Sequence, residues 1–175
     1  MSFEIQNREL MYTGRAFTIR RVTARLPNGK VRSFDLVDHA PSITVIPLTE
    51  DGKLLLVRQY RIGAGATLLE LPAGVMEESE DPLESARREL REETGMDAHV
   101  FQKLGAAYLS PGYCSEYMHF YLAKGLSPAP LEQDEDEFLN LEAYPVAEVY
   151  RMARSGELHD SKTLAALLLA EADLR

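Results

Sequence analysis

The chain has 175 residues, of which 45% are hydrophobic and 27% charged, and its formal net charge at pH 7 is −9. This length is typical of one domain with its own hydrophobic core, and the deficit of basic residues argues against nucleic-acid binding and membrane-surface attachment. No window approaches the ~18 apolar residues that a membrane-spanning helix needs, and the N-terminus lacks the apolar segment of a signal peptide. Cys114, the single cysteine, cannot form an internal disulfide. We therefore expect a cytoplasmic protein with neither a nucleic-acid nor a membrane partner.

Strand patterns dominate the first half of the chain. Residues 15–26 alternate loosely between apolar and polar side chains, and a phase slip at Arg20–Arg21 predicts a β-bulge or a twist there. The sequence Pro27-Asn28-Gly29 predicts a tight turn into a second strand through residues 34–36. By the same criteria, the further strands are expected at residues 42–48, 53–60, 69–71, 100–108, 117–123 and 138–143.

Three segments have the features of helices. Residues 82–94 begin with a proline suited to a first turn and are followed by Gly95 as a stop. A second helix is expected at residues 146–154, and a third at residues 163–172 with Ser161 as its N-cap. Many hairpin strands with few helices predict an α+β fold, in which helices flank a mixed sheet.

The helix at residues 82–94 carries three acidic residues near its C-terminal end. Glu89 and Glu93 are four residues apart and share a face, with Glu92 beside them, whereas Arg88 is placed to pair with Glu92. Glu89 and Glu93 then remain a like-charge pair at the negative end of the helix dipole, which is unfavourable without a cation. A hard divalent ion prefers such oxygen ligands. Taken alone, however, the pattern is more typical of a solvated acidic face.

Residues upstream of this helix change the interpretation. Gly74 permits close approach of the backbone to a ligand, and Glu80 stands at the junction of loop and helix. The whole segment, GVMEESEDPLESARRELREETGM over residues 74–96, resembles the Nudix box, the signature of the Nudix hydrolases. Every fixed position of that motif is filled, by Gly74, Glu80, Arg88, Glu89, Leu90, Glu92, Glu93, Gly95 and Met96.

The resemblance implies a Nudix fold, an α/β/α sandwich around a mixed β-sheet. It also implies hydrolysis of a nucleoside diphosphate linked to another group, with Mg²⁺ as cofactor and Mn²⁺ as a substitute. By position, the implied metal ligands are Ala73 through its carbonyl, Glu89, Glu92 and Glu93, the last two also being catalytic. Glu80, Arg88 and Gly95 are implied to be structural. Such chemistry is reasonable, because a divalent ion neutralises a diphosphate and lowers the pKa of a bound water.

Segments outside the box are similar to the ADP-ribose pyrophosphatase branch of this family. They are residues 57–61, residues 110–112 with Glu116, the acidic run at residues 134–138, and residues 156–163. The resemblance implies substrate binding by Arg58, Arg61, Gly74, Pro111, Gly112 and Glu116. It implies a catalytic base from the acidic run, either Glu135 or Glu137, because a loop has no period that selects one. Each segment also has a plainer interpretation. Arg58 and Arg61 could be ordinary arginines at a strand end, Pro111-Gly112 an ordinary turn, and the acidic run a solvated loop.

The expected substrate is therefore a nucleotide sugar, ADP-ribose, cleaved to AMP and ribose 5-phosphate. We divide the chain into an N-terminal β-hairpin extension, residues 1–40, and a Nudix domain, residues 41–175; in the resembling enzymes such an extension contributes to a homodimer. Two alternatives stay open. One is hydrolysis of another nucleotide sugar, such as GDP-mannose. The other is a Nudix module that binds ADP-ribose without cleaving it, although every acid of the box is present here.

Overall fold

The computed structural model describes residues 2–132 and 138–174. The chain divides into two compact units, the first containing Met1–Pro41 and Tyr108–Tyr117 and the second containing Ser42–Ala107 and Met118–Arg175. In the part of the chain that is described, no helix combines the length and the apolar character needed to cross a membrane.

The first unit contains a sheet of three antiparallel strands. They are β1 (Glu4–Thr13), β2 (Phe17–Arg25) and β3 (Val31–His39), in that order. The predicted turn between β2 and β3 is confirmed: Gly29 has a φ of 81°, and its N–H donates to the Leu26 carbonyl at 2.9 Å. Of the two alternatives at Arg20–Arg21, a bulge in β2 is wrong with respect to β3, because β2 pairs with β3 without interruption. The register shifts lie instead in β1, after Ile5 and after Leu10.

A mixed sheet of seven strands forms the centre of the second unit. Its main path is β10-β5-β4-β9-β8, with β6 paired to β5 and β7 paired to β4. The bounds are β4 (Ser42–Leu48), β5 (Lys53–Arg61), β6 (Ala66–Glu70), β7 (Ala73–Val75), β8 (Met96–Tyr108), β9 (Tyr117–Pro128) and β10 (Asn140–Pro145). Strand β4 is parallel to β9 and antiparallel to β7. It is buried over nearly its whole length, as expected for a central strand.

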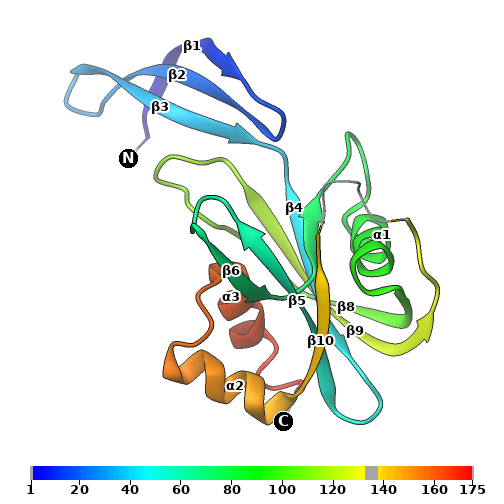
Figure 1. The fold of residues 1–175 in the computed structure, drawn as a ribbon. Coiled ribbons are helices and arrows are strands. Elements are labelled where there is room, and N and C mark those ends of the chain that lie inside the picture. The colour runs from blue at the N-terminus through cyan, green and yellow to red at the C-terminus, as the bar shows by residue number, and fades with distance from the viewer. Residues whose placement is uncertain (1, 133–137, 175) are drawn as a thin grey trace. The chain divides into compact units, whose positions relative to one another are not determined.

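Helices cover both faces of this sheet (Figure 1): α1 (Pro82–Thr94) lies on one face, and α2 (Val146–Ser155) and α3 (Ser161–Leu169) lie on the other. The expected α/β/α sandwich is therefore confirmed. Helix α1 buries Ala86 and Leu90 in a cluster with Ile43 and Val45 of β4. This packing fixes the acidic face of α1 relative to the centre of the sheet.

Local capping explains where α1 and α3 begin and end. The Asp81 side chain accepts a hydrogen bond from the Leu83 N–H, and Gly95 ends α1 with a φ of 71°. For α3 the expected N-cap was Ser161, but the structure shows Asp160 in that role, with Ser161 as the first helical residue. A carboxylate at this position both accepts the free N–H groups and complements the positive end of the helix dipole.

Candidate active site

The connection from β6 through β7 to α1 brings the predicted box residues together. The Pro72 carbonyl accepts two hydrogen bonds from β4, one from the Val45 N–H at 2.9 Å and one from the Thr44 hydroxyl at 3.0 Å. Gly74 then pairs with Ile43. These bonds hold β7 against β4 and fix its position beside α1.

Gly74 and Glu89 approach each other closely. A Cβ atom added at Gly74 would lie 1.9 Å from the carboxyl carbon of Glu89. Any other residue at this position would therefore displace the Glu89 carboxylate. The side chain of Glu89 is almost completely buried.

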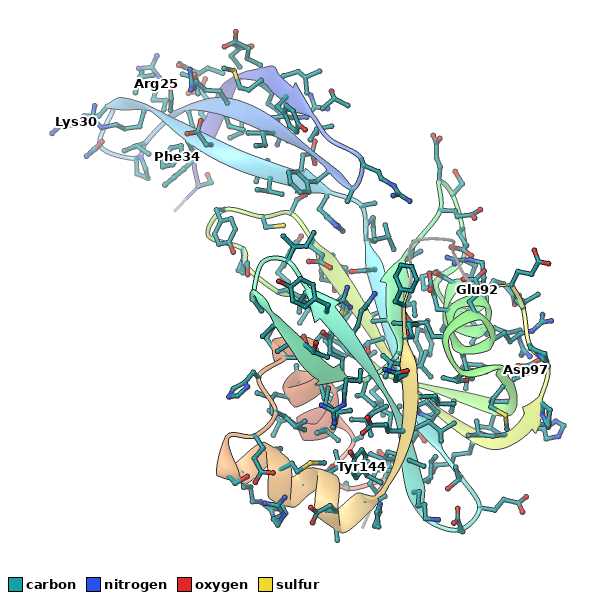
Figure 2. The ribbon with its side chains drawn as sticks, viewed as in Figure 1. Arg25, Lys30, Phe34, Glu92, Asp97 and Tyr144 are labelled. Carbon is teal, nitrogen blue, oxygen red and sulfur yellow. The ribbon has the colours of Figure 1, made fainter. Side chains whose placement is uncertain are left out.

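Glu93 binds the same strand one turn further along α1. Its Oε2 accepts a hydrogen bond from the Ala73 N–H at 3.1 Å, and the residue is only 3% exposed. Glu92 is also on α1 and is more exposed (Figure 2). The structure thus brings the predicted ligands Ala73, Glu89, Glu92 and Glu93 to one end of α1 and the adjacent strand.

The Arg88 guanidinium lies among these acids. Its Nη1 donates to Glu89 Oε1 at 2.7 Å and to Glu92 Oε2 at 2.9 Å. The expectation that Glu89 lacks a partner on its own helix is therefore wrong, because Arg88 reaches both carboxylates. Its Nε also donates to Glu80 Oε1 at 3.0 Å, and this hydrogen bond lowers the pKa of Glu80 below its usual value.

The remaining contacts of Glu80 tie the loop before α1 to the helix. Its Oε2 accepts hydrogen bonds from the Glu77 N–H at 2.9 Å and from Arg88 Nη2 at 3.1 Å. Nη2 of Arg88 also donates to the Val75 carbonyl at 3.2 Å. Charge-assisted bonds of this kind hold a loop in one conformation.

A cleft of about 380 Å³ lies beside these residues. Its lining is Arg61, Ala73, Gly74, Val75, Glu77, Arg88, Glu89 and Glu92. The acids and the backbone supply only oxygen donors, which fits a hard divalent cation such as Mg²⁺. Among residues 2–132 and 138–174, no three His, Cys, Asp or Glu side chains form a ready-made metal site. The positive charge beside Glu89 and Glu92 is that of Arg88.

The two arginines predicted to bind substrate point to different places. Arg61 lines the cleft, where its Nη2 donates to Glu70 at 2.7 Å. Arg58 lines a separate pocket and forms a bidentate ion pair with Glu142 of β10. Its Nε donates to Oε1 at 2.7 Å and its Nη2 donates to Oε2 at 3.0 Å. The hydrogen bonds from Arg58 and then from Tyr144 lower the pKa of Glu142 to about 2.

The other predicted site residues lie elsewhere. Pro111, Gly112 and Glu116 belong to the first unit, in a turn where the Tyr113 and Cys114 N–H groups donate to the Ser110 carbonyl. Glu135 and Glu137 lie outside the described residues.

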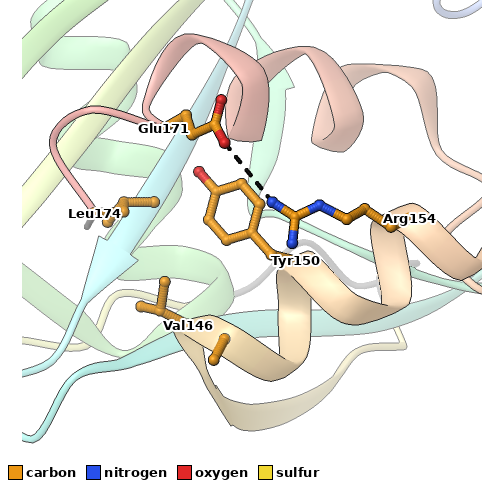
Figure 3. Close-up of a pocket in the computed structure, with 6 residues that line it drawn as sticks. Val146, Tyr150, Arg154, Glu171 and Leu174 are labelled. Atoms are coloured by element: carbon orange, nitrogen blue, oxygen red, sulfur yellow. Dashed lines mark ion pairs between the residues drawn. The ribbon is translucent and has the colours of Figure 1, made fainter.

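A further pocket, of about 370 Å³, lies between α2 and the C-terminal residues (Figure 3). Arg154 and Glu171 form an ion pair of 3.7 Å at its edge, and the Arg154 guanidinium lies 5.7 Å from the Tyr150 ring centroid. None of the predicted site residues lines this pocket, so the acidic cleft is the candidate active site.

Comparison with known proteins identifies the family. Residues 38–167 match the family model of the NUDIX domain. The ADP-ribose pyrophosphatase of Bacillus subtilis (strain 168) is 35% identical over 162 residues, which cover 91% of this chain and 88% of that protein. The GDP-mannose pyrophosphatase of Salmonella arizonae (strain ATCC BAA-731 / CDC346-86 / RSK2980) is 32% identical over 168 residues, 86% of each protein. The crystal structure of an ADP compounds hydrolase matches with a TM-score of 0.88 and 28% identity, covering 99% of this chain and 95% of that one. The family predicted from residues 74–96 is thus confirmed, and the chain belongs to the Nudix hydrolases.

Proposed function

We propose that this enzyme hydrolyses the diphosphate bond of ADP-ribose, with Mg²⁺ as cofactor, to give AMP and ribose 5-phosphate. The observation that carries the proposal is the cleft in which Gly74, Glu89 and Glu92 lie beside the Ala73–Glu93 hydrogen bond. The similarity to an ADP-ribose pyrophosphatase over most of both chains supports the choice of substrate.

Glu89, Glu92, Glu93 and the Ala73 carbonyl are the groups that would hold the ion, with Mn²⁺ as a substitute. When bound, it would neutralise diphosphate oxygens and lower the pKa of a water molecule. Arg61 at the wall of the cleft would donate hydrogen bonds to the diphosphate. Glu80, Arg88 and Gly95 keep the loop and helix in place for this purpose. Either Glu135 or Glu137 would accept the proton of the attacking water.

The remaining predicted contacts to substrate also stay part of the proposal. Gly74 lines the cleft and would contact the diphosphate. Arg58 lines a separate pocket and Pro111, Gly112 and Glu116 belong to the first unit, so their proposed contacts to substrate rest on the sequence resemblance. The second candidate substrate is GDP-mannose, which the similarity to a GDP-mannose pyrophosphatase favours. Both substrates carry the same diphosphate, and the acids of the cleft recognise only that part.

A substrate comparison tests this proposal. The purified chain is incubated with Mg²⁺ and either ADP-ribose or GDP-mannose, and a phosphatase specific for monoesters converts the products to inorganic phosphate. We expect strong preference for ADP-ribose. Preference for GDP-mannose would overturn the substrate but keep the chemistry. No hydrolysis of either, with ADP-ribose still bound, would replace the proposed activity with a binding function.

We also propose that residues 1–40 form a dimerisation element and that the protein acts in the cytoplasm, where a single cysteine stays reduced. The strands of this segment expose large apolar side chains, among them Ile5 and Leu10. Phe34, labelled in Figure 2, is another. Such surfaces are typical of interfaces between subunits. Light scattering after size-exclusion chromatography at micromolar concentration should show a dimer, and a monomer would contradict this assignment.

A further inference from the structure

A completely buried carboxylate lies at the end of β6, directly before the strand that carries Gly74. Glu70 accepts hydrogen bonds from Arg61, from Nε at 2.9 Å and from Nη2 at 2.7 Å. The Lys162 ammonium donates to the same carboxylate. A buried carboxylate is costly unless it is paired, and here it has two cationic partners.

Lys162 comes from the first turn of α3, and its side chain is only 10% exposed. Its Nζ also lies 3.0 Å from Asp160, whose carboxylate accepts hydrogen bonds from the Thr163 N–H and hydroxyl. The Thr163 hydroxyl in turn accepts a hydrogen bond from the Leu71 N–H at 2.9 Å. The start of α3 is therefore bonded to the two residues that lead into the cleft.

Arg61 connects this buried group to the cleft. Two of its nitrogens are used by Glu70, whereas Nη1 makes no hydrogen bond to any of the residues that the structure describes. Arg61 also lines the cleft beside Gly74 and Glu89. Glu70 thus holds the guanidinium in one orientation and leaves one nitrogen for a ligand.

The charges of the group explain why a second cation is needed. A single carboxylate bonded to Arg61 alone would make a neutral pair, and the cleft would lose the positive charge that attracts an anion. Lys162 balances Glu70, so Arg61 keeps its charge toward the cleft. Asp160 also pairs with Lys162, at 3.0 Å, and the N-terminus of α3 offsets part of its negative charge.

We propose that Lys162 is a positioning residue for the diphosphate site, which acts through Glu70 on Arg61. This gives a role to the segment at residues 156–163, which the candidate active site alone does not explain. The inference rests on the proposed function, in which Arg61 contacts the diphosphate. Neither Lys162 nor Glu70 is expected to touch the substrate.

A set of variants separates this role from a purely structural one. Lys162→Met removes the ammonium, and Glu70→Gln/Lys162→Met removes both buried charges while leaving an acceptor for Arg61. Arg154→Met is the matched control, because it also removes one positive charge from a helix on this face of the sheet, outside the network. KM and kcat for ADP-ribose and the melting temperature are measured for each.

We expect Lys162→Met to raise KM about tenfold and to change kcat by less than about threefold, because Arg61 would bind both substrate and transition state less well. The double variant should return KM to within about threefold of wild type, since the charge beside Arg61 is balanced again. The control should leave both constants unchanged. A lower melting temperature with unchanged KM in Lys162→Met would overturn the proposal.

If Lys162→Met does not fold, the double variant Glu70→Gln/Lys162→Met tests the proposal by itself. A KM raised about tenfold in the double variant would contradict the idea that Lys162 acts by balancing the charge of Glu70. Inorganic pyrophosphate provides a measurement independent of hydrolysis. It should raise the melting temperature of wild type and of Arg154→Met more than that of Lys162→Met. If pyrophosphate stabilises Lys162→Met less than wild type but wild type cleaves neither nucleotide sugar, the proposed function is refuted while the role of Lys162 is kept. Equal stabilisation of all three proteins by pyrophosphate, or of none of them, would overturn the positioning role of Lys162.

Discussion

Replacing Gly74 by alanine perturbs the contact between β7 and α1 with the smallest change available. The new methyl group would lie 1.9 Å from the Glu89 carboxyl carbon, whereas ordinary contacts begin at 3.4 Å. Glu89 must therefore move by about 1.5 Å or more, since neither strand nor helix can separate cheaply in a packed core. Such a movement breaks the 2.7 Å hydrogen bond between Arg88 and Glu89.

The expected cost follows from that bond. A hydrogen bond between charged groups contributes about 1.5–3 kcal/mol, and Glu89 is too buried for water to replace it fully. For a chain of this size, at about 2–4 °C per kcal/mol, the melting temperature should fall by about 3–12 °C. A displacement of this size at a proposed metal ligand should lower kcat by about 100-fold.

Gly63→Ala is the control, because a Cβ at Gly63 meets nothing within 4 Å. Its melting temperature should stay the same or rise slightly, as the unfolded chain loses freedom. Calorimetry and the phosphate-release assay are applied to both variants. If Gly74→Ala kept wild-type turnover and stability, the close packing of Glu89 against β7 would be refuted.

Further predictions concern the acids and their partners. Glu93→Gln keeps an acceptor for the Ala73 N–H, so its melting temperature should change little while turnover falls more than about 100-fold; near-normal turnover would contradict the role of Glu93. Chelation by EDTA should abolish hydrolysis and added Mg²⁺ should restore it, and full activity in EDTA would exclude the metal. Arg88→Lys should destabilise the fold by about 2 kcal/mol in urea unfolding, because an ammonium cannot bond Glu80, Glu89 and Glu92 together. Since the pKa of Glu142 is lowered to about 2, its stabilising effect is complete above its usual value of 4.5 and is lost as the pH falls from there toward 2. The melting temperatures of wild type and Glu142→Gln should thus converge as the pH is lowered from about 5 toward 2, and a constant difference would contradict this.

Local features of the sequence predicted α1 and the box residues well. Pro82 at the start of α1 and Gly95 at its end each act within one turn of the helix, so the bounds of α1 follow from adjacent residues. Strand β1 was not predicted because every residue in it is exposed, which leaves no alternation between apolar and polar side chains. Asp160 and Ser161 are both suitable N-caps, and sequence alone does not rank them.

Strand geometry separates the two arginines that sequence similarity had grouped. Arg58 and Arg61 are three residues apart, and side chains alternate between faces along a strand, so they point in opposite directions from β5. The alternation of side chains along a strand can be read from the sequence. The ion-pair partners cannot, because Arg58 binds Glu142, 84 residues away, and Lys162 binds Glu70, 92 residues away. Contacts between such distant positions depend on the order of strands in the sheet.

The proposed site has to meet two opposing electrostatic requirements, because a divalent ion would need several carboxylates while a diphosphate would be repelled by them. The fold separates the two demands by giving each arginine at the cleft its own carboxylate outside the ion-binding set. Glu80 holds Arg88 against the acids of α1, and Glu70 holds Arg61 at the wall. Lys162 is needed only in the second case, because Glu70 is completely buried, whereas Glu80 is partly solvated and water screens its charge. The burial of Glu70 therefore explains why the C-terminal segment, far along the chain from the box, contributes a charged residue to this region.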